Sequence, residues 1–279
     1  MKKLKQVVNF FYEKLDAIYD RDELDGLIYW TIESYFNLSR SKFKLIDDRV
    51  LAQNEIEFLL DVVKRLSNNE PIQYIFGETT FYDLPFKVDK NCLIPRPETE
   101  ELVNWVLENP KSKILDLGTG SGCIAISVKK NCNADVSAID ISEKALELAS
   151  YNAIKNNVSI KFSKEDIFEI DKLEKVDVII SNPPYVLESD KNKMEENVLQ
   201  FEPHQALFVP DEAPLKFYKK IISIAEKSLN KNGYIYFEIH ENKANEIIDL
   251  FCENYFSNIE VKTDLQGKQR MIRAQFIKE

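Results

Sequence analysis

A glycine-rich loop between two apolar segments constrains the fold of this chain more than any other feature. The apolar run Lys113–Leu117 is followed by Gly118–Gly122, which reads Gly-Thr-Gly-Ser-Gly, and then by the apolar stretch Cys123–Val128. This order is typical of a strand, a tight loop and a helix in an α/β sheet. Glycine lets the backbone approach a ligand closely, and the free N–H groups at the helix start suit an anionic group. A dinucleotide-binding fingerprint would need glycine where the chain has Cys123, so the spacing favours another nucleoside ligand.

Acidic residues lie at the ends of the strands expected around this loop. Asp116 lies within the first strand, the strand expected at 135–139 is followed by Asp140, and Asp166 follows the next one. The carboxyl ends of strands in an open α/β sheet line one crevice, where such folds bind ligands. We expect Asp140 to accept both ribose hydroxyls of a ligand. Asp166 and Ile167 would hold its adenine, and Asp116 would meet an ammonium group. Taken singly, each acid could equally be a solvated loop residue or a helix cap.

The motif Asn-Pro-Pro-Tyr at 182–185 directly follows an apolar run that predicts a buried strand. Proline has no N–H and a fixed φ, so Pro183 and Pro184 remove two local donors and stiffen the turn. The side-chain oxygen of Asn182 and the carbonyl of Pro183 then remain as acceptors for two N–H donors, and Tyr185 offers a flat face. An amide or aromatic amine nitrogen is a poor nucleophile because its lone pair is delocalised. The motif therefore indicates methylation of a planar nitrogen, the alternative being an ordinary proline-rich turn.

The rest of the chain predicts two domains. Residues 5–67 show helical spacing of apolar side chains and contain neither proline nor glycine apart from Gly26. Alternation at 81–93, with a bend at Asp83–Pro85, predicts a β-hairpin. Strands and helices then alternate, and the short turn between the last two strands predicts an antiparallel edge. The expected strands lie near residues 113–117, 135–139, 158–162, 176–181, 233–239, 257–262 and 270–277.

Composition narrows the classes of function. The 279 residues include 44% hydrophobic residues, enough for a sizeable core, and carry a net charge of −10, which argues against a broad grip on nucleic-acid phosphates. The four cysteines show no C-x-x-C spacing and no metal-binding cluster is visible, so we expect no metal. The N-terminus lacks an apolar signal core, and no apolar run is long enough to cross a membrane. We therefore expect a cytoplasmic protein.

Three strings together resemble one family over nearly the whole chain. They are Leu115–Ala125, Ser181–Tyr185 and Leu93–Glu100, the last reading Leu-Ile-Pro-Arg-Pro-Glu-Thr-Glu, and they look like the bacterial peptide chain release factor glutamine methyltransferases, the PrmC/HemK family. Smaller matches are Glu202 with Pro203, and Asp264 with Gly267 and Arg270. The resemblance implies a class I S-adenosylmethionine-dependent methyltransferase fold, with a Rossmann-like seven-stranded sheet, a small N-terminal helical domain and a β-hairpin connector.

The activity that the resemblance implies is methyl transfer from S-adenosyl-L-methionine to a glutamine side-chain amide, leaving S-adenosyl-L-homocysteine. The glutamine is the one in the Gly-Gly-Gln motif of peptide chain release factors. We expect a helical substrate-docking domain at 1–75, a hairpin connector at 76–95 and a catalytic domain at 96–279. The expected enzyme is a monomer whose partners are release factors, without direct binding to nucleic acid or membrane.

The same reasoning assigns the site. Asn182, Pro183 and Tyr185 are the expected catalytic residues, and Pro184 joins them in binding the substrate. The expected cofactor-binding residues are Arg96, Glu98, Asp116, Gly118, Thr119, Gly120, Ser121, Gly122, Asp140, Asp166, Ile167 and Asn182. Arg96 and Glu98 could instead form surface ion pairs. We expect no general base near the motif, because the amide nitrogen loses its proton readily once it is alkylated.

Alternatives and departures remain open at this point. The substrate could be a ribosomal-protein glutamine or the N6 nitrogen of a nucleic-acid adenine, and a non-catalytic module with a nucleotide-like pocket is a further possibility. His240 and Lys243 stand where the family usually has glycine and glutamine, and the family's glycine-rich stretch is replaced at 208–212. Residues 187–201, rich in charged side chains, form either a mobile flap over the substrate or a solvated loop.

Overall fold

The computed structural model describes residues 3–38 and 48–278. The chain divides into two compact units. The helical unit comprises Met1–Gly77 together with Glu195–Phe201, and the sheet unit comprises Glu78–Met194 together with Glu202–Glu279. The sequence did not indicate that a short segment from the second half of the chain would group with the N-terminal helices.

The helical unit has one apolar core. In the part of the unit that the structure describes, the helices are α1 (Leu4–Leu15), α2 (Arg21–Phe36), α4 (Gln53–Leu66), α5 (Ile72–Phe76) and α9 (Glu196–Phe201). Asp20 caps α2 by accepting a hydrogen bond from the Glu23 backbone N–H at 2.9 Å. Asn69 Nδ2 donates to Glu196 Oε2 at 2.9 Å and so joins α9 to the unit. The part of the expected helical region at 39–47 lies outside the described residues.

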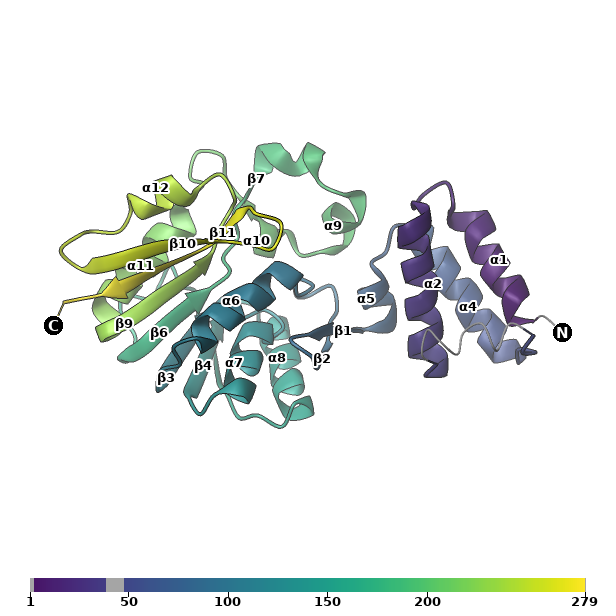
Figure 1. The fold of residues 1–279 in the computed structure, drawn as a ribbon, viewed down its shortest axis with the longest axis horizontal. Helices are drawn as coiled ribbons and strands as arrows, with labels where there is room; N and C mark the ends of the chain where they lie inside the picture. Colours follow the sequence, from purple (N-terminus) through teal and green to yellow (C-terminus); the bar gives the residue numbers. More distant parts are fainter. Residues whose placement is uncertain (1–2, 39–47, 279) are drawn as a thin grey trace. The chain divides into compact units, whose positions relative to one another are not determined.

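The expected α/β sheet of seven strands is confirmed in the sheet unit (Figure 1). Its strands are β3 (Lys113–Leu117), β4 (Asp135–Asp140), β5 (Lys161–Lys164), β6 (Val176–Ser181), β9 (Leu229–Glu238), β10 (Phe256–Thr263) and β11 (Gln269–Phe276). The spatial order is β10-β11-β9-β6-β3-β4-β5, and β11 is antiparallel to both of its neighbours. The expected antiparallel edge is confirmed, because the edge strand β10 pairs in the antiparallel direction with β11, which lies one strand inside the edge.

One strand starts later than expected. The expected strand at 158–162 is displaced to β5, because the turn that closes the preceding helix includes residues 157 and 158. Asn157 has a left-handed φ of 57°, and the Val158 N–H donates to the Ala153 carbonyl at 3.0 Å. This closing turn uses the backbone donor of Val158 before the chain can pair with β4.

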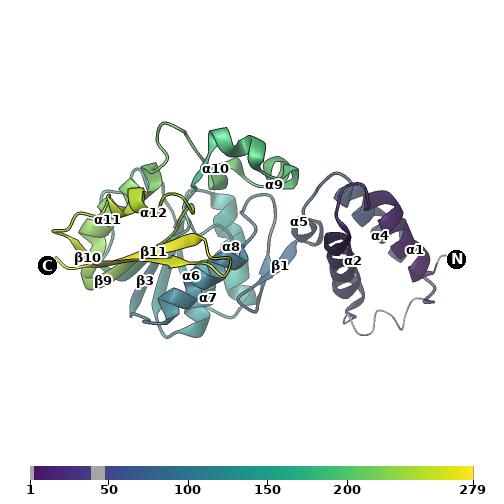
Figure 2. The same cartoon turned by 45° about the horizontal axis from the view of Figure 1, so that its top comes forward.

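Helices cover both faces of the sheet, so its central strands are buried on both sides (Figures 1 and 2). The helices packed with one core are α6 (Pro97–Leu107), α7 (Cys123–Asn131) and α8 (Glu143–Lys155). The helices packed with the other core are α11 (Lys216–Ser228) and α12 (Ala244–Ile248). Successive residues of β6 alternate between the cores, with Val178 and Ile180 in the first and Ile179 in the second.

The expected hairpin lies slightly earlier than the sequence indicated. It consists of β1 (Glu78–Phe81) and β2 (Leu84–Lys87), joined by Tyr82 and Asp83, whose φ angles are 52° and 58°. Two residues with positive φ are what a tight two-residue hairpin turn requires. Pro85 lies within β2 rather than at the bend.

The charged segment after the Asn-Pro-Pro-Tyr motif has regular structure. It contains β7 (Val186–Leu187), a 3-10 helix (Glu188–Lys193) and then α9, with α10 (His204–Leu207) and β8 (Phe208–Val209) beyond it. β7 and β8 pair in parallel as a small separate sheet. Their backbone pairing holds the two ends of the segment together.

Gly122 packs the glycine loop against α8. Its φ is +82°, and a Cβ there would lie 2.9 Å from Ile126 Cδ1 and 3.1 Å from Ala149 Cβ. Gly120 also has positive φ, at +54°, but a Cβ there would meet nothing within 4 Å.

We expect Gly122→Ala to destabilise the protein more than Gly120→Ala, because only the first adds overpacking of about 1–3 kcal/mol to the shared backbone strain. Urea unfolding of both cofactor-free variants measures the difference, and equal losses would contradict the packing role.

Candidate active site

A cavity of about 390 Å³ opens at the carboxyl ends of β3, β4 and β6. Its wall is formed by the glycine loop, by the segments that follow β4 and β5, and by the start of the Asn-Pro-Pro-Tyr motif. Most of the predicted site residues line it: Arg96, Gly118, Thr119, Gly120, Ser121, Asp140, Asp166, Ile167, Asn182, Pro183 and Pro184. Four predicted residues do not line it: Glu98, Asp116, Gly122 and Tyr185. The strand ends thus bring three separate sequence motifs to one cavity, as a crevice of this fold requires.

Asp140 fixes the shape of the glycine loop. Its Oδ2 accepts from the Gly120 N–H at 2.8 Å, and its Oδ1 accepts from the Ser142 N–H at 2.8 Å. Burial raises the pKa of this carboxyl, against the opposing effect of the backbone donors. Each carboxylate oxygen has a second lone pair, so the group can still accept hydrogen bonds from a ligand in the cavity.

Asp116 lies beneath the loop and is fully buried. Its Oδ2 accepts from the Thr119 hydroxyl at 2.6 Å, while its Oδ1 has no hydrogen-bond partner of normal geometry. Burial raises the pKa of Asp116 to about 7, although the Thr119 hydroxyl and the Ala125 backbone N–H act in the opposite direction. A buried carboxylate oxygen without a partner is costly, and a cationic group nearby would relieve that cost.

The Asn-Pro-Pro-Tyr motif is held by a chain of hydrogen bonds. Asn182 Nδ2 donates to Thr99 Oγ1 at 3.3 Å, and the Thr99 hydroxyl donates to Glu238 Oε2 at 2.6 Å. The Tyr185 hydroxyl donates to Glu238 Oε1 at 3.1 Å. The Tyr185 ring packs against the apolar core rather than the cavity, so the flat face expected for the substrate is not part of the described wall.

Sequence reasoning missed two buried carboxylates near the site. Glu238 ends the apolar strand β9 and is only 2% exposed, and Glu202 is 4% exposed. Glu202 accepts from the Ile94 N–H at 3.2 Å and pairs with Arg96. The signal that could have found Glu238 is an acidic residue within an apolar run, because a buried charge requires partners.

The alternative roles of Arg96 and Glu98 can now be separated. Arg96 lines the cavity and its guanidinium pairs with the buried Glu202, so it is not a surface ion pair. Glu98 accepts from Gln266 Nε2 at 3.5 Å and faces the turn between β10 and β11. A cofactor role for Glu98 has no support from its position.

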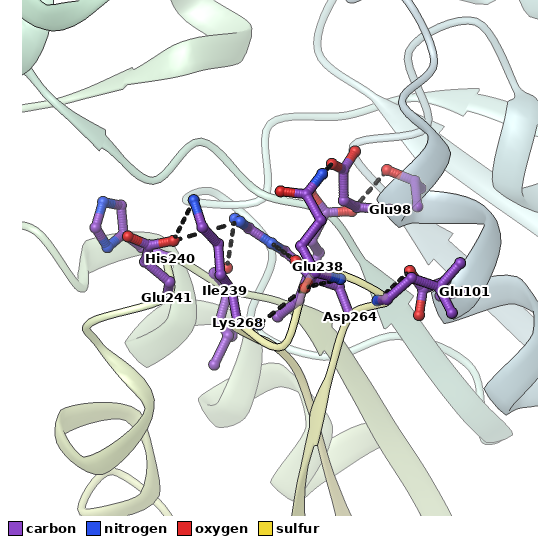
Figure 3. A network of polar contacts seen from close by, with 12 residues as sticks. Glu98, Glu101, Glu238, Ile239, His240, Glu241, Asp264 and Lys268 are labelled. Atoms are coloured by element: carbon purple, nitrogen blue, oxygen red, sulfur yellow. Dashed lines mark hydrogen bonds and ion pairs between the residues drawn. The ribbon is translucent and has the colours of Figure 1, made fainter.

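The turn between β10 and β11 is tied to β9 and α6 (Figure 3). Asp264 Oδ1 accepts from the backbone N–H groups of Gln266 and Lys268, at 3.0 and 2.9 Å, and Asp264 Oδ2 accepts from Arg270 Nε at 3.2 Å. On the α6 side, Glu101 Oε1 accepts from the Leu265 N–H at 3.0 Å. These contacts account for the aspartate and arginine of the family pattern as residues that shape the turn.

Two of the departures from the family pattern, His240 and Lys243, have local partners. His240 lies edge-on to Tyr185, with ring centroids 6.1 Å apart, and its Nδ1 accepts from the Asn242 N–H. Burial lowers the pKa of His240. Lys243, which precedes α12, pairs with Glu246 at 2.7 Å.

The chain is similar to known protein families and to curated relatives. The family model for the methyltransferase small domain matches residues 97–204, and the model for the PrmC N-terminal domain matches residues 6–77. The chain is 44% identical to a release factor glutamine methyltransferase of Flavobacterium psychrophilum, over 95% of this chain and 96% of that protein. It is 38% identical to one of Bacteroides thetaiotaomicron, over 97% and 99%.

The chain belongs to the release factor glutamine methyltransferase family. A solved methyltransferase of Pyrococcus furiosus shares the fold, with a TM-score of 0.54 and 20% identity over 76% of this chain and 96% of that one. The expected class I methyltransferase fold is confirmed. Among the described residues, no helix is long and apolar enough to cross a membrane.

S-adenosylmethionine is the cofactor of this family, and the residues present fit it. Gly118 and Gly120 leave open space where side chains would project, so a ligand can approach the loop backbone. Asp140 and Asp166 offer carboxylates in the same cavity, and Asp116, whose Oδ1 has no hydrogen-bond partner of normal geometry, accepts from Thr119 in the cavity wall. An acidic wall also suits a cofactor that carries positive charge.

Asp116 makes the cofactor-free protein sensitive to pH. Its folded-state pKa of about 7 exceeds the usual 3.8, so the folded chain holds this proton more tightly than the unfolded chain does, and stability falls as pH rises from about 4 to about 7. We expect Asp116→Asn to lack this loss. The unfolding free energy of Asp116→Asn, measured relative to that of the native chain, should therefore increase by at most about 4 kcal/mol as the pH rises from about 4 to about 7. Urea unfolding at pH 5 and pH 8 tests this, and a difference that does not change with pH would contradict it.

Proposed function

We propose that this protein transfers a methyl group from S-adenosylmethionine to the side-chain amide nitrogen of the glutamine in the Gly-Gly-Gln motif of peptide chain release factors, in the cytoplasm. The observation that carries the proposal is that Asn182 and Pro183 line the same cavity as the glycine loop, Asp140 and Asp166. The names of relatives that match nearly the full chain support the glutamine substrate over an adenine. The net charge of −10 also disfavours a nucleic-acid substrate.

The cofactor would be held by the acids and the loop together. Asp140 would accept from the ribose hydroxyls, Asp166 and Ile167 would flank the adenine, and Asp116 would meet the ammonium group. When bound, the cofactor supplies an electrophilic methyl group on a positively charged sulfur. The glycine loop would approach the cofactor through its backbone, because no side chain stands in the way at Gly118 or Gly120.

Asn182 and Pro183 would orient the glutamine amide. Asn182 Nδ2 is engaged by Thr99, so its Oδ1 remains to accept one substrate N–H, and the Pro183 carbonyl would accept the other. Two acceptors fix the plane of the amide and expose its nitrogen to the methyl group, and such positioning supplies most of the rate gain. Glu238 does not line the cavity and already accepts two hydrogen bonds, so it is not placed to remove the proton. The alkylated amide would lose its proton to water.

We expect Asn182→Ala to lower turnover by at least on the order of 10²-fold, because the acceptor that orients the amide in the transition state is lost. Cofactor affinity should stay within a few-fold, since the glycine loop and the acids are unchanged. Methyl transfer to a release factor, located by mass spectrometry, measures the first quantity and calorimetry the second. Turnover near that of the native chain would remove Asn182 from the mechanism.

The helical unit is proposed to dock the protein substrate. A side-chain slot supplies too little contact area to select one glutamine on a folded protein. The unit offers half-buried aromatic side chains, including Tyr35 and Phe58, whose rings stack with centroids 4.2 Å apart. Aromatic side chains of this kind are common in protein interfaces.

A chain that begins at Glu78 tests the docking role. Such a chain lacks the unit with which Glu195–Phe201 groups, so its folding and cofactor binding are verified first. We expect its methylation of a full-length release factor to fall much more than its methylation of a short Gly-Gly-Gln peptide. Equal losses on the two substrates would mean that the helical unit supports the fold rather than docking.

A further inference from the structure

Asn182 can present either of two atoms to the cavity, and only one suits the substrate. Its side-chain amide carries an acceptor oxygen and a donor nitrogen of nearly equal size. A substrate amide nitrogen that carries two N–H donors requires the oxygen. Rotation of the Asn182 amide by a half-turn would instead set a donor against a donor. The site therefore needs a contact that distinguishes the two ends of this amide.

Thr99 makes that contact and is itself given a direction by Glu238. A threonine hydroxyl has one proton to donate and two lone pairs to accept with. At 2.6 Å from Glu238 Oε2, the Thr99 hydroxyl donates its proton to the carboxylate. Only its lone pairs then face Asn182, so the atom of Asn182 that lies 3.3 Å from Thr99 Oγ1 must be the donor Nδ2.

We infer that Glu238 is a positioning residue that fixes, through the hydroxyl of Thr99, which end of the Asn182 amide faces the substrate. This inference rests on the proposed function for its substrate. It gives roles to Thr99, which lines the cavity, and to Glu238, which does not line it. Without the carboxylate, the threonine proton is free to point at Asn182, and the amide loses its directional cue.

Hydrogen bonds make both oxygens of Glu238 acceptors. Its second oxygen, Oε1, accepts from the Tyr185 hydroxyl at 3.1 Å, so each oxygen of the side chain receives a hydrogen bond. Burial raises the pKa of Glu238 above its usual value, and the two hydroxyl donors and the nearby Arg270 guanidinium oppose that rise. Arg270 is held by Asp264 at 3.2 Å and also contacts the Ile239 carbonyl, directly after Glu238 in the chain. Figure 3 shows Glu238 between this turn and α6.

Glu238→Gln is the direct test, because it keeps the shape of the side chain and removes its obligatory acceptor character. The new amide can donate to Thr99, whose proton is then free to meet Asn182 Oδ1. We expect kcat for methylation of a release factor to fall at least about tenfold, with cofactor affinity within about threefold of the native value. Glu101→Gln is the matched control: Glu101 lies on the same helix as Thr99 and contacts Leu265 instead, so its kcat should stay within about threefold.

Two Thr99 variants distinguish the effect of the hydroxyl hydrogen bond from the effect of side-chain packing. Thr99→Ser retains the hydroxyl and should keep kcat within about threefold, whereas Thr99→Val has the same shape without the hydroxyl and should lose at least about tenfold. These variants also cover the case in which Glu238→Gln fails to fold. Equal activity of Thr99→Val and Thr99→Ser would overturn the inference.

The strictest test exchanges the donor and acceptor character of both Glu238 and Asn182, the two residues at the ends of the hydrogen-bonded chain through Thr99. Asn182→Asp alone sets an oxygen against the lone pairs of Thr99, and its kcat should fall. In Glu238→Gln/Asn182→Asp the proton of Thr99 can point to the new carboxylate, whose other oxygen still accepts from the substrate. We expect the double variant to be faster than either single variant. If the fold-loss in kcat of the double variant equals the product of the two single fold-losses, Glu238 does not act on Asn182 through Thr99 and the inference is refuted.

A readout without substrate separates this inference from the proposed function. The side-chain N–H signals of Asn182 in a nitrogen–proton NMR spectrum are identified by their disappearance in Asn182→Asp. They should shift in Glu238→Gln and stay in place in Glu101→Gln. If the native chain methylates no release factor, the proposed function fails while this signal still reports on the relay. If the native chain is active and both the signal and kcat of Glu238→Gln are unchanged, the inference fails.

Discussion

Burying an ionisable carboxyl group at the end of a strand imposes conditions on everything packed around it. Glu238 lies among apolar residues of the sheet, and the free energy of removing a carboxylate from water is several kcal/mol unless donors and a cation replace the solvent. The donors come from α6 and from the motif after β6, and the cation comes from β11. Three segments that are distant in sequence therefore meet around this carboxyl group. The Asn-Pro-Pro-Tyr motif is held in place partly because its Tyr185 hydroxyl supplies one of the hydrogen bonds that Glu238 needs.

The carboxyl group of Asp116, beside the glycine loop, has the opposite character, because it is incompletely satisfied. Asp116 keeps one oxygen without a partner of normal geometry, and burial raises the pKa of this carboxyl as well as that of Asp140. A site of this kind is destabilising while it has no cationic ligand near it, and part of the binding energy of such a ligand is the relief of that condition. The structure around the loop is stabilised by apolar packing, including the close contact between Gly122 and α8.

Sequence reasoning could predict the parts of the site that depend on local pattern. The strand, glycine loop and helix around Gly118 follow from periodicity and backbone freedom, and the acids at strand ends follow from the topology of parallel sheets. It could not predict Glu238 and Thr99 as partners, because they are 139 residues apart and meet only through the tertiary fold. The late start of β5 was missed for a different reason: a helix-closing turn at Asn157 competes with strand pairing for the same backbone donor. Tyr185 was expected in the cavity because its neighbours are there, whereas its hydroxyl is held by Glu238.

The chain passes between the helical unit and the sheet unit three times: after Gly77, after Met194 and after Phe201. The last crossing leads directly into Glu202, whose carboxylate pairs with Arg96 in the cavity wall. One peptide bond therefore separates the last residue of the helical unit from a residue that holds the wall of the cofactor cavity.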